Sequence, residues 1–221
     1  MKILKFLAVA ATVGGLAGCA TKVGTTKTVY YADEHAQRGS ISVVAHDSKL
    51  NNSLEFSPKR KVIEKYLTNV GYRVVDENSN PDFIAFVSYG ISNGETETSS
   101  VPIFGQTGGG TTYHSGSVNS YGSFGNYSGT SYTMPTFGIV GSQTVSNTYY
   151  TRNIAIDIVL ASSLGNESPK KMYEIRGKSV GSCAVIESVF ESITAAMFED
   201  FPGENGKPKN VQIEWIEKSG C

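Results

Sequence analysis

The chain has 221 residues, with 19 basic and 20 acidic side chains; it contains 24 glycines, and 39% of its residues are hydrophobic. This length fits one sizeable domain, and the balanced charge gives no sign of the basic field that is typical of nucleic-acid binding. The modest hydrophobic content and the many glycines predict a normal core diluted by a segment that does not pack.

The N-terminus has the pattern of a secretory signal. Lysines in the first few residues precede a short apolar run, which is too short to span a bilayer, and small residues follow it. The run ends in Leu16-Ala17-Gly18-Cys19. This sequence resembles the lipobox of bacterial lipoproteins, in which the cysteine is freed by cleavage and acylated. We therefore predict a lipoprotein signal peptide over residues 1–18 and lipid attachment at Cys19.

The predicted acylation implies a location. Several acyl chains on one cysteine hold a protein stably at a membrane, whereas a single chain binds only marginally. Ala20 follows the cysteine, and in lipoproteins of the enterobacterial type an aspartate at this place favours the inner membrane. We expect a lipid-anchored protein of the bacterial cell envelope, with the outer membrane favoured and the chain facing the periplasm or the surface. The membrane is then one partner, and nucleic acid is not.

Two cysteines remain after Cys19, and both lie in the second half of the chain. Cys183 and Cys221 form an even pair in an oxidising compartment, where disulfides persist. One interpretation is a disulfide that ties the C-terminus to the chain near Cys183. The other is a buried, apolar Cys183 and a free thiol at Cys221.

The mature chain divides into a tether, a domain and a tail. Residues 19–28 are polar and are expected to link the lipid to the folded part. Residues 29–217 are expected to form a single domain, and residues 218–221 a C-terminal tail. The domain is interrupted by an insertion at about residues 99–148.

Before the insertion, the pattern predicts strands and one helix. A β-branched run over residues 40–45 predicts a strand, and so do residues 72–75 and the more apolar residues 81–90, which favour a central place in a sheet. Between the first two of these strands, apolar residues recur at helical spacing, while Lys59 and its charged neighbours fall on the other side of the predicted helix. Gly71 stands where a left-handed cap would end this helix. The apolar residues of the helix are Val62, Ile63, Tyr66, Leu67 and Val70.

After the insertion, the pattern predicts a hairpin, a helix and a last strand. The strand over residues 149–160 alternates in its second half and pairs with residues 171–180 through a turn at residues 164–169. A helix is predicted over about residues 185–198 and a strand over residues 211–216. The whole pattern indicates an α+β fold, with a mixed, mainly antiparallel sheet and two helices on one of its faces.

Several short motifs resemble those of the domain of unknown function 4136 family. They are Asn52-Ser53-Leu54-Glu55-Phe56, Gly71-Tyr72, Pro81-Asp82-Phe83 with Tyr89-Gly90, and Phe198-Glu199-Asp200-Phe201-Pro202-Gly203. The resemblance implies an α+β domain of a bacterial envelope lipoprotein, with a Gly- and aromatic-rich insertion between central strands. It implies no reaction, ligand or catalytic residue, because these motifs consist of packing and turn residues.

The insertion differs in composition from the rest of the chain. From Thr98 to Thr151 there is no Asp, Glu, Lys or Arg, and Gly, Ser, Thr, Asn and Tyr dominate. Low hydrophobicity predicts a flexible loop, because little apolar burial is available to offset the ordering entropy. The frequent Tyr, Phe, Val and Thr instead allow a long protruding β-hairpin.

We find no motif that indicates catalysis, a cofactor or a metal. The glycine run at Gly105–Thr112 lacks the lysine of a phosphate-binding loop. The three histidines have no metal-ligand spacing, and no nucleophile elbow is present. An enzyme is therefore the third-ranked class, and it would need a cleft that brings His46, Asp47 or His114 to a nucleophile.

The insertion is the feature that predicts a function. Tyrosines among Ser, Gly and Asn are typical of binding surfaces, where rigid rings supply contact area. We expect a non-enzymatic binding or scaffolding role, in which the insertion contacts an envelope protein or stacks on glycan rings. The alternative is a structural component that self-assembles by strand addition. The candidate contact residues are Tyr113, Tyr121, Phe124, Tyr127 and Tyr132.

Overall fold

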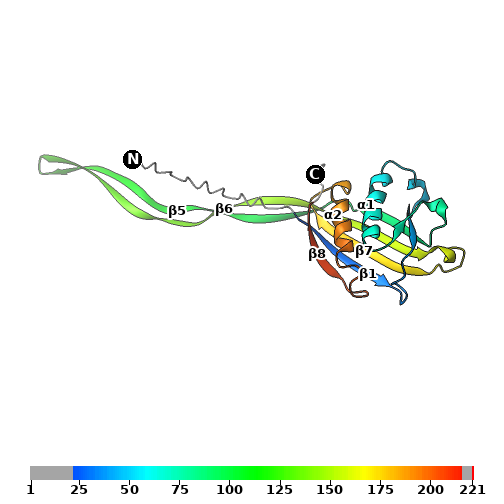
Figure 1. The fold of residues 1–221 in the computed structure, drawn as a ribbon. Helices are drawn as coiled ribbons and strands as arrows, with labels where there is room; N and C mark the ends of the chain where they lie inside the picture. The colour runs from blue at the N-terminus through cyan, green and yellow to red at the C-terminus, as the bar shows by residue number, and fades with distance from the viewer. Residues whose placement is uncertain (1–21, 216–220) are drawn as a thin grey trace, which may run out of the picture. The chain divides into compact units, whose positions relative to one another are not determined.

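The computed structural model describes residues 22–215 and residue 221. The predicted signal peptide and Cys19 lie outside the described residues, as does most of the predicted tail. The chain forms two compact units. We call them the domain, which contains the residues up to Ser92 and from Thr151 onward, and the arm, Asn93–Tyr150 (Figure 1).

The domain is built on one mixed sheet. Its strands follow the order β3-β2-β4-β6-β7-β1-β8, and β5 pairs with β6 alone. β2 pairs in parallel with β3 and β4, whereas β4 with β6 and β1 with both β7 and β8 are antiparallel. The strands are β1 (Lys22–Tyr31), β2 (Ser40–Ala45), β3 (Arg73–Val74), β4 (Phe83–Ile91), β5 (Glu95–Ser120), β6 (Ser123–Leu160), β7 (Lys171–Gly181) and β8 (Lys209–Glu214).

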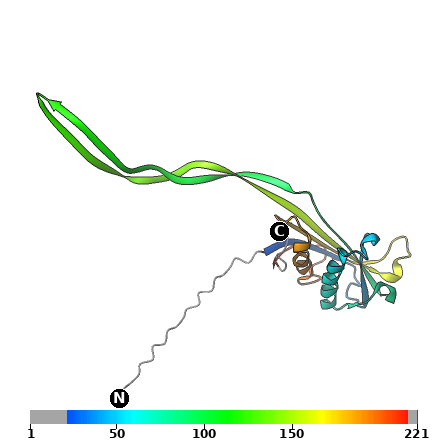
Figure 2. The ribbon, with the colours of Figure 1, turned by 90° about the horizontal axis from the view of Figure 1, so that it is seen from above.

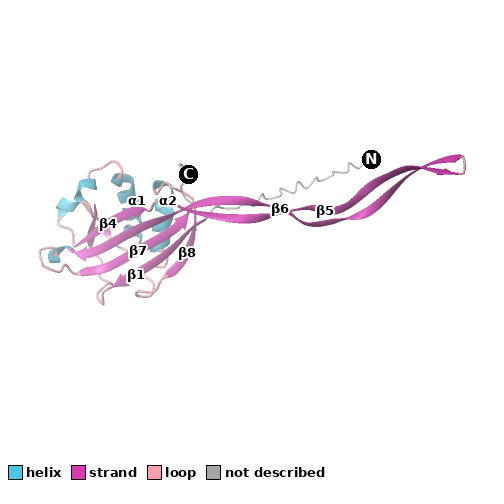
Figure 3. Ribbon diagram, turned by 180° about the vertical axis from the view of Figure 1, so that it is seen from behind, coloured by secondary structure: helices cyan, strands magenta, loops and turns pink. Residues whose placement is uncertain are grey.

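Two helices, α1 (Phe56–Asn69) and α2 (Glu187–Phe198), cover one face of this sheet (Figure 3). Three short 3₁₀ turns, Ser48–Leu50, Glu77–Ser79 and Ala161–Ser163, lie in the connections. Alternate residues of the central strands face the helices and form the core with them. The predicted α+β fold is confirmed, and so are the two helices and the interior place of β4.

Local residues define the ends of α1. The Ser53 hydroxyl accepts a hydrogen bond from the Phe56 N–H at 3.0 Å, and the Ser53 carbonyl accepts one from the Ser57 N–H. Ser53 therefore acts as the N-terminal cap. At the other end, Gly71 has φ +97°, a left-handed conformation that side chains disfavour and that stops the helix.

The prediction of a tether at residues 19–28 is wrong over its described part, because Lys22 to Thr28 belong to β1. This strand lies between β7 and β8 and buries Val23, Thr25, Lys27 and Val29. Two of these four inward residues are polar, so the segment lacks the hydrophobic alternation that identifies a strand in a sequence.

Lys59 is buried, although helical periodicity assigns it to the polar side of α1. Its side chain is 3% exposed, and its ammonium forms ion pairs with Glu187 at 2.7 Å and Glu55 at 3.6 Å. The ammonium also lies 4.7 Å from the centre of the Tyr89 ring. Lys59 therefore joins α1, α2 and β4, which a pattern read along one helix does not reveal.

The elements after the arm lie close to their predicted positions. β6 and β7 are neighbours joined by a short connection, and the Leu160 N–H donates to the Lys170 carbonyl where the connection closes. β8 ends at Glu214, earlier than predicted. Cys183 and Cys221 form a disulfide with Cα atoms 5.2 Å apart, which corresponds to the first of the two interpretations.

The arm is a two-stranded antiparallel hairpin, not a loop. β5 pairs with β6 from Glu95↔Tyr149 to Ser120↔Ser123, and the two strands twist around each other (Figure 2). Tyr121 and Gly122 form the turn, both with positive φ, as a two-residue hairpin turn of type I′ requires. Despite the low hydrophobicity of the segment, the two strands pair over its whole length.

Candidate functional site

The arm exposes apolar side chains along its whole length. No residue of the arm is buried, and within the described part of the chain its two strands pair only with each other. The exposed large hydrophobic residues are Val101, Ile103, Phe104, Tyr113, Val118, Tyr121, Phe124, Tyr127, Tyr132, Met134, Phe137, Ile139, Val140 and Tyr149. Extended apolar exposure of this kind is characteristic of interaction surfaces.

The outer part of the arm is regular, whereas its middle is not. The pairing shifts three times between Ile103 and Gly110, and Pro102 and Pro135 flank or lie within this irregular stretch. Beyond it, pairing runs without a shift from Gly110↔Thr133 to Ser120↔Ser123. We call residues 110–133 the distal hairpin.

The register sorts the predicted contact aromatics onto two faces of the distal hairpin. Residues directly opposite each other in a ladder share a face, and successive residues alternate. Tyr113 pairs with Thr130 and Tyr132 pairs with Thr111, so the two tyrosines lie on the same face, two residue pairs apart along the ladder. Phe124 lies further along the same face. Tyr113 and Phe124 are each 82% exposed, and Tyr132 is 69% exposed. We call this side of the ribbon the aromatic face.

Tyr127 and Tyr121 do not belong to the aromatic face. Tyr127 pairs with Gly116 on the opposite face, and a Cβ atom added to Gly116 would lie 2.5 Å from its ring. The ring therefore lies over the glycine backbone, and a side chain at position 116 would displace it. Tyr121 is the first residue of the turn and is fully exposed.

The side chains between the aromatic residues are polar but carry no charge. Asn119, Ser117 and Ser115 share the face on β5, and Asn126 and Ser128 share it on β6. Rings flanked by amides and hydroxyls can stack on, and hydrogen-bond with, a neutral partner. An ionic partner would find no opposite charge here.

Among the described residues, no strand pairs with either outer edge of the distal hairpin. Ser120 and Ser123 close the two-residue turn as a hydrogen-bonded pair, and the two kinds of pair then alternate along the ladder. The backbone N–H and C=O groups that point away from β5 are therefore those of Phe124, Asn126, Ser128, Thr130 and Tyr132. Such a row is a template for another strand.

The residues considered for catalysis do not form a site. The His46 ring packs edge-on against Phe86, and the Asp47 carboxylate accepts a hydrogen bond from the Lys49 N–H. His114 lies in the arm, where its Nε2 is 2.9 Å from the Ser131 hydroxyl. No group of residues in the described ranges has the composition of a metal site.

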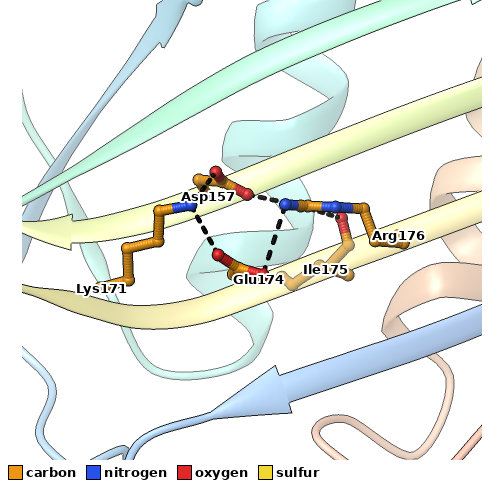
Figure 4. A network of polar contacts seen from close by, with 5 residues as sticks. All are labelled: Asp157, Lys171, Glu174, Ile175 and Arg176. Carbon is orange, nitrogen blue, oxygen red and sulfur yellow. Dashed lines mark hydrogen bonds and ion pairs between the residues drawn. The ribbon is translucent and has the colours of Figure 1, made fainter. Parts of the chain in front are cut away.

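A charged cluster covers the sheet face that the helices leave open (Figure 4). Asp157 on β6 pairs with Lys171 at 3.0 Å and with Arg176, and Glu174 pairs with Lys171 at 2.5 Å. Burial alone would raise the pKa of Asp157, but hydrogen bonds from Arg176 and Lys171 outweigh it, and the pKa lies below its ordinary value. Two acids and two bases neutralise one another, so this cluster offers no free charge to a ligand.

The buried Lys27 also has a structural role. Its ammonium donates to the Glu199 carbonyl at the C-terminal end of α2, where the helix dipole favours a cation. Burial is the main reason that its pKa is lowered. A pocket of about 340 Å³ lies beside it, but Asp200 and Lys209 on the rim pair with each other at 2.7 Å.

The family motifs serve packing. The Asp82 carboxylate accepts hydrogen bonds from the Ser40 N–H at 2.7 Å and the Ser40 hydroxyl at 2.6 Å, which joins the starts of β2 and β4. The Phe201 ring packs at a tilt against the rings of both Phe198 and Tyr173. These contacts explain the motifs without invoking a ligand.

Comparison with known proteins assigns no activity to the chain. No curated protein matches it. Among solved structures, a PDZ domain protein from Parabacteroides distasonis is similar at 11% identity with a TM-score of 0.38. The match covers 88% of this chain but 40% of the other, so this chain spans less than half of that protein. Likeness at this level assigns neither fold nor function.

No helix within residues 22–215 combines the length and apolar character of a membrane span. A family model described as Domain of unknown function (DUF4136) matches residues 20–203, which is most of the chain. This match confirms the resemblance carried by the packing motifs. The chain therefore belongs to the family described as Domain of unknown function (DUF4136).

Proposed function

We propose that the chain is a non-enzymatic lipoprotein of the bacterial envelope, anchored by Cys19 with the outer membrane favoured, that binds or scaffolds an envelope component through its arm. The arm is the observation that carries the proposal. It exposes rings on an uncharged ribbon, whereas the charged clusters of the domain described above pair internally.

The aromatic face is the proposed contact surface within the arm. Tyr113, Tyr132 and Phe124 share it, and each ring keeps most of its surface free. Rigid aromatic side chains lose little conformational entropy on binding and supply large contact areas. In this proposal, the domain connects the arm to the lipid anchor at Cys19.

The anchor is tested separately from the arm. Cells that produce the full chain are grown with labelled palmitate, and incorporation is compared with that of Cys19→Ala. We expect label on the first and none on the second. Label on Cys19→Ala, or its absence from the parent chain, contradicts the anchor.

The arm is tested by a deletion that preserves the register. Glu97 and Asn147 lie directly opposite each other, so residues 98–146 are replaced by Asn-Gly, which closes a two-residue turn. Crosslinking in intact cells then compares what the parent and the shortened chain capture. We expect the shortened chain to keep its domain fold and to lose its crosslinked products.

A finer comparison tests the aromatic face. Tyr113→Ser combined with Tyr132→Ser removes two rings from that face, and Tyr127→Ser removes one from the other. We expect the double variant to lose most crosslinking and Tyr127→Ser to keep it. Unchanged capture by the shortened chain would show that the arm is not the contact surface.

A further inference from the structure

We propose that the partner of the distal hairpin is a second copy of this chain, which pairs antiparallel along the outer edge of β6. This inference rests on the proposed function of the arm as the contact surface and names its partner. Residues 123–133 of the two copies overlap fully, so that Ser128 lies opposite Ser128 of the second copy. The two hairpins then form one four-stranded sheet.

The first argument is the missing third strand. An isolated two-stranded hairpin is only marginally stable in water, and three or more strands are usually needed for independent stability. The distal hairpin has no other strand beside it among the described residues, and all its rings are exposed. A second hairpin supplies the missing neighbours.

The second argument is that the edge is unprotected. Natural edge strands avoid pairing by being short or by carrying charges and prolines. The edge strands of the domain follow this rule, since β3 (Arg73–Val74) has two residues and β8 carries Lys209 directly after Pro208. Residues 110–133 contain no Asp, Glu, Lys, Arg or Pro.

The third argument is self-complementarity. A two-fold interface brings each residue near its counterpart, so a charged edge would repel its own copy. The β6 edge carries no charge. In the full-overlap register, Phe124 of each copy lies opposite Tyr132 of the other, which gives two aromatic cross-strand pairs. The β5 edge in the corresponding register pairs Thr111 with Asn119 and gains no such pair.

The backbone also fits this arrangement. Five residues of β6 point their N–H and C=O groups away from β5, so two copies can exchange about ten hydrogen bonds. The interface ends at the turn on one side and before Pro135 on the other, because proline has no N–H to donate.

Paired cysteine variants of the full chain test the register and the edge together. Ser128 and Ser115 lie directly opposite each other in the hairpin, so Ser128→Cys and Ser115→Cys differ only in the strand that carries the thiol. In the proposed sheet, the two copies of position 128 are roughly 5 Å apart, whereas the two copies of position 115 lie three strand spacings apart, about 14 Å. A disulfide requires Cα atoms within about 7 Å.

Cells that produce each variant are oxidised mildly, and dimers are measured on non-reducing gels. We expect at least about ten times more dimer from Ser128→Cys than from Ser115→Cys or the parent chain, because thiols at position 115 are too far apart to join. Equal amounts from the two variants, or more from Ser115→Cys, would overturn the proposal. The parent chain reports any dimer that arises from its own cysteines.

A second pair of variants tests the interface without a covalent bond. Ser128→Lys places two like charges opposite each other, whereas Ser115→Lys adds the same charge on the far strand. In purified full chain in detergent, sedimentation should show a dimer dissociation constant at least about tenfold higher for Ser128→Lys and less than about twofold changed for Ser115→Lys, because like charges directly opposite repel. A monomeric parent chain at every concentration tested would refute self-pairing.

The outcomes distinguish this inference from the proposed function. If the arm captures another envelope component in intact cells and no second copy, the inference fails and the proposed function stands. If the arm captures nothing, both fail. A crosslink specific to Ser128→Cys, together with the effect of Ser128→Lys, supports both.

Discussion

β6 passes through both units, and its two parts are stabilised in different ways. In the domain, residues 152–160 lie between β4 and β7 and bury Ile154, Ile156 and Ile158. In the arm, residues 123–150 have one neighbouring strand and bury no side chain. The same strand is thus part of a core in one unit and an exposed ribbon in the other.

This difference in burial shows that different interactions stabilise the domain and the arm. Within the described residues, the domain is held by a hydrophobic core, a disulfide and ion pairs. The arm has backbone pairing and cross-strand hydroxyl contacts such as Thr96 with Thr148 at 3.0 Å. Its apolar surface is left for a partner. Four predictions test this contrast.

The largest expected effect on stability comes from removing a phenylalanine ring from the domain, and removal of a phenylalanine ring from the arm is the matched comparison. Phe56 is 0% exposed, so Phe56→Ala should lower the free energy of unfolding of the domain by about 3–5 kcal/mol, through lost burial and the cavity left behind. Phe124→Ala should change it by less than about 0.5 kcal/mol. Urea unfolding at low protein concentration measures both. Equal losses would contradict the contrast.

Loss of the disulfide should come second. Cys183 and Cys221 are 38 residues apart, and closing a loop of this size stabilises a fold by about 2–4 kcal/mol. Cys221→Ser should lower domain stability by that amount. Hydrogen exchange of the amides in the arm should stay unchanged. Faster exchange throughout the arm would mean that the two units do not unfold separately.

Removal of the helix cap should have a smaller effect. Ser53→Ala deletes the hydroxyl that accepts from the Phe56 N–H, at a cost of about 1 kcal/mol. The matched control is Thr98→Ala, which removes a hydroxyl 3.2 Å from that of Ser146 in the arm. Thermal unfolding of the domain should respond to Ser53→Ala alone.

The smallest effect depends on pH. The pKa of Asp157 lies below its ordinary value of 3.8, so its ion pairs stabilise the domain above that value, and this contribution is lost as the pH falls through the lowered pKa. Asp157→Asn should therefore cost about 1 kcal/mol or less at neutral pH and nothing once the carboxylate is protonated in strong acid. The arm has no acidic residue from Thr98 to Tyr150, and its pairing there should not follow this dependence. Urea unfolding of the parent chain and of Asp157→Asn, from neutral pH to strong acid, checks the prediction. A difference in unfolding free energy that stays constant at all pH values would exclude the ion-pair origin.

Periodicity predicted most of the domain because hydrophobic alternation directly reflects burial. Ile154, Ile156 and Ile158 alternate and face the helices as expected. Periodicity fails where polar residues face inward. The buried Thr25 and Lys27 are polar, so β1 lacks the apolar alternation by which a strand is recognised in a sequence. The buried Lys59 is likewise indistinguishable in sequence from its solvent-exposed neighbours.

The arrangement of the arm could be predicted only in part. Composition identified the insertion and its aromatic residues, but which rings share a face depends on the register. That register depends on the position of the turn, and several glycines of the distal hairpin offer alternatives to Tyr121–Gly122. The Cys183–Cys221 pairing likewise depends on a distance that only the fold supplies.

The continuity of β6 has a mechanical consequence. The arm is joined to the domain through β4, which precedes β5, and through β6, and these two strands pair with each other from Phe83↔Leu160 to Ile91↔Arg152. Both are interior strands of the sheet. Tension on the arm is therefore transmitted to the centre of the sheet, where β2 and β7 resist it on either side, and the edge strands β3 and β8 are not pulled first.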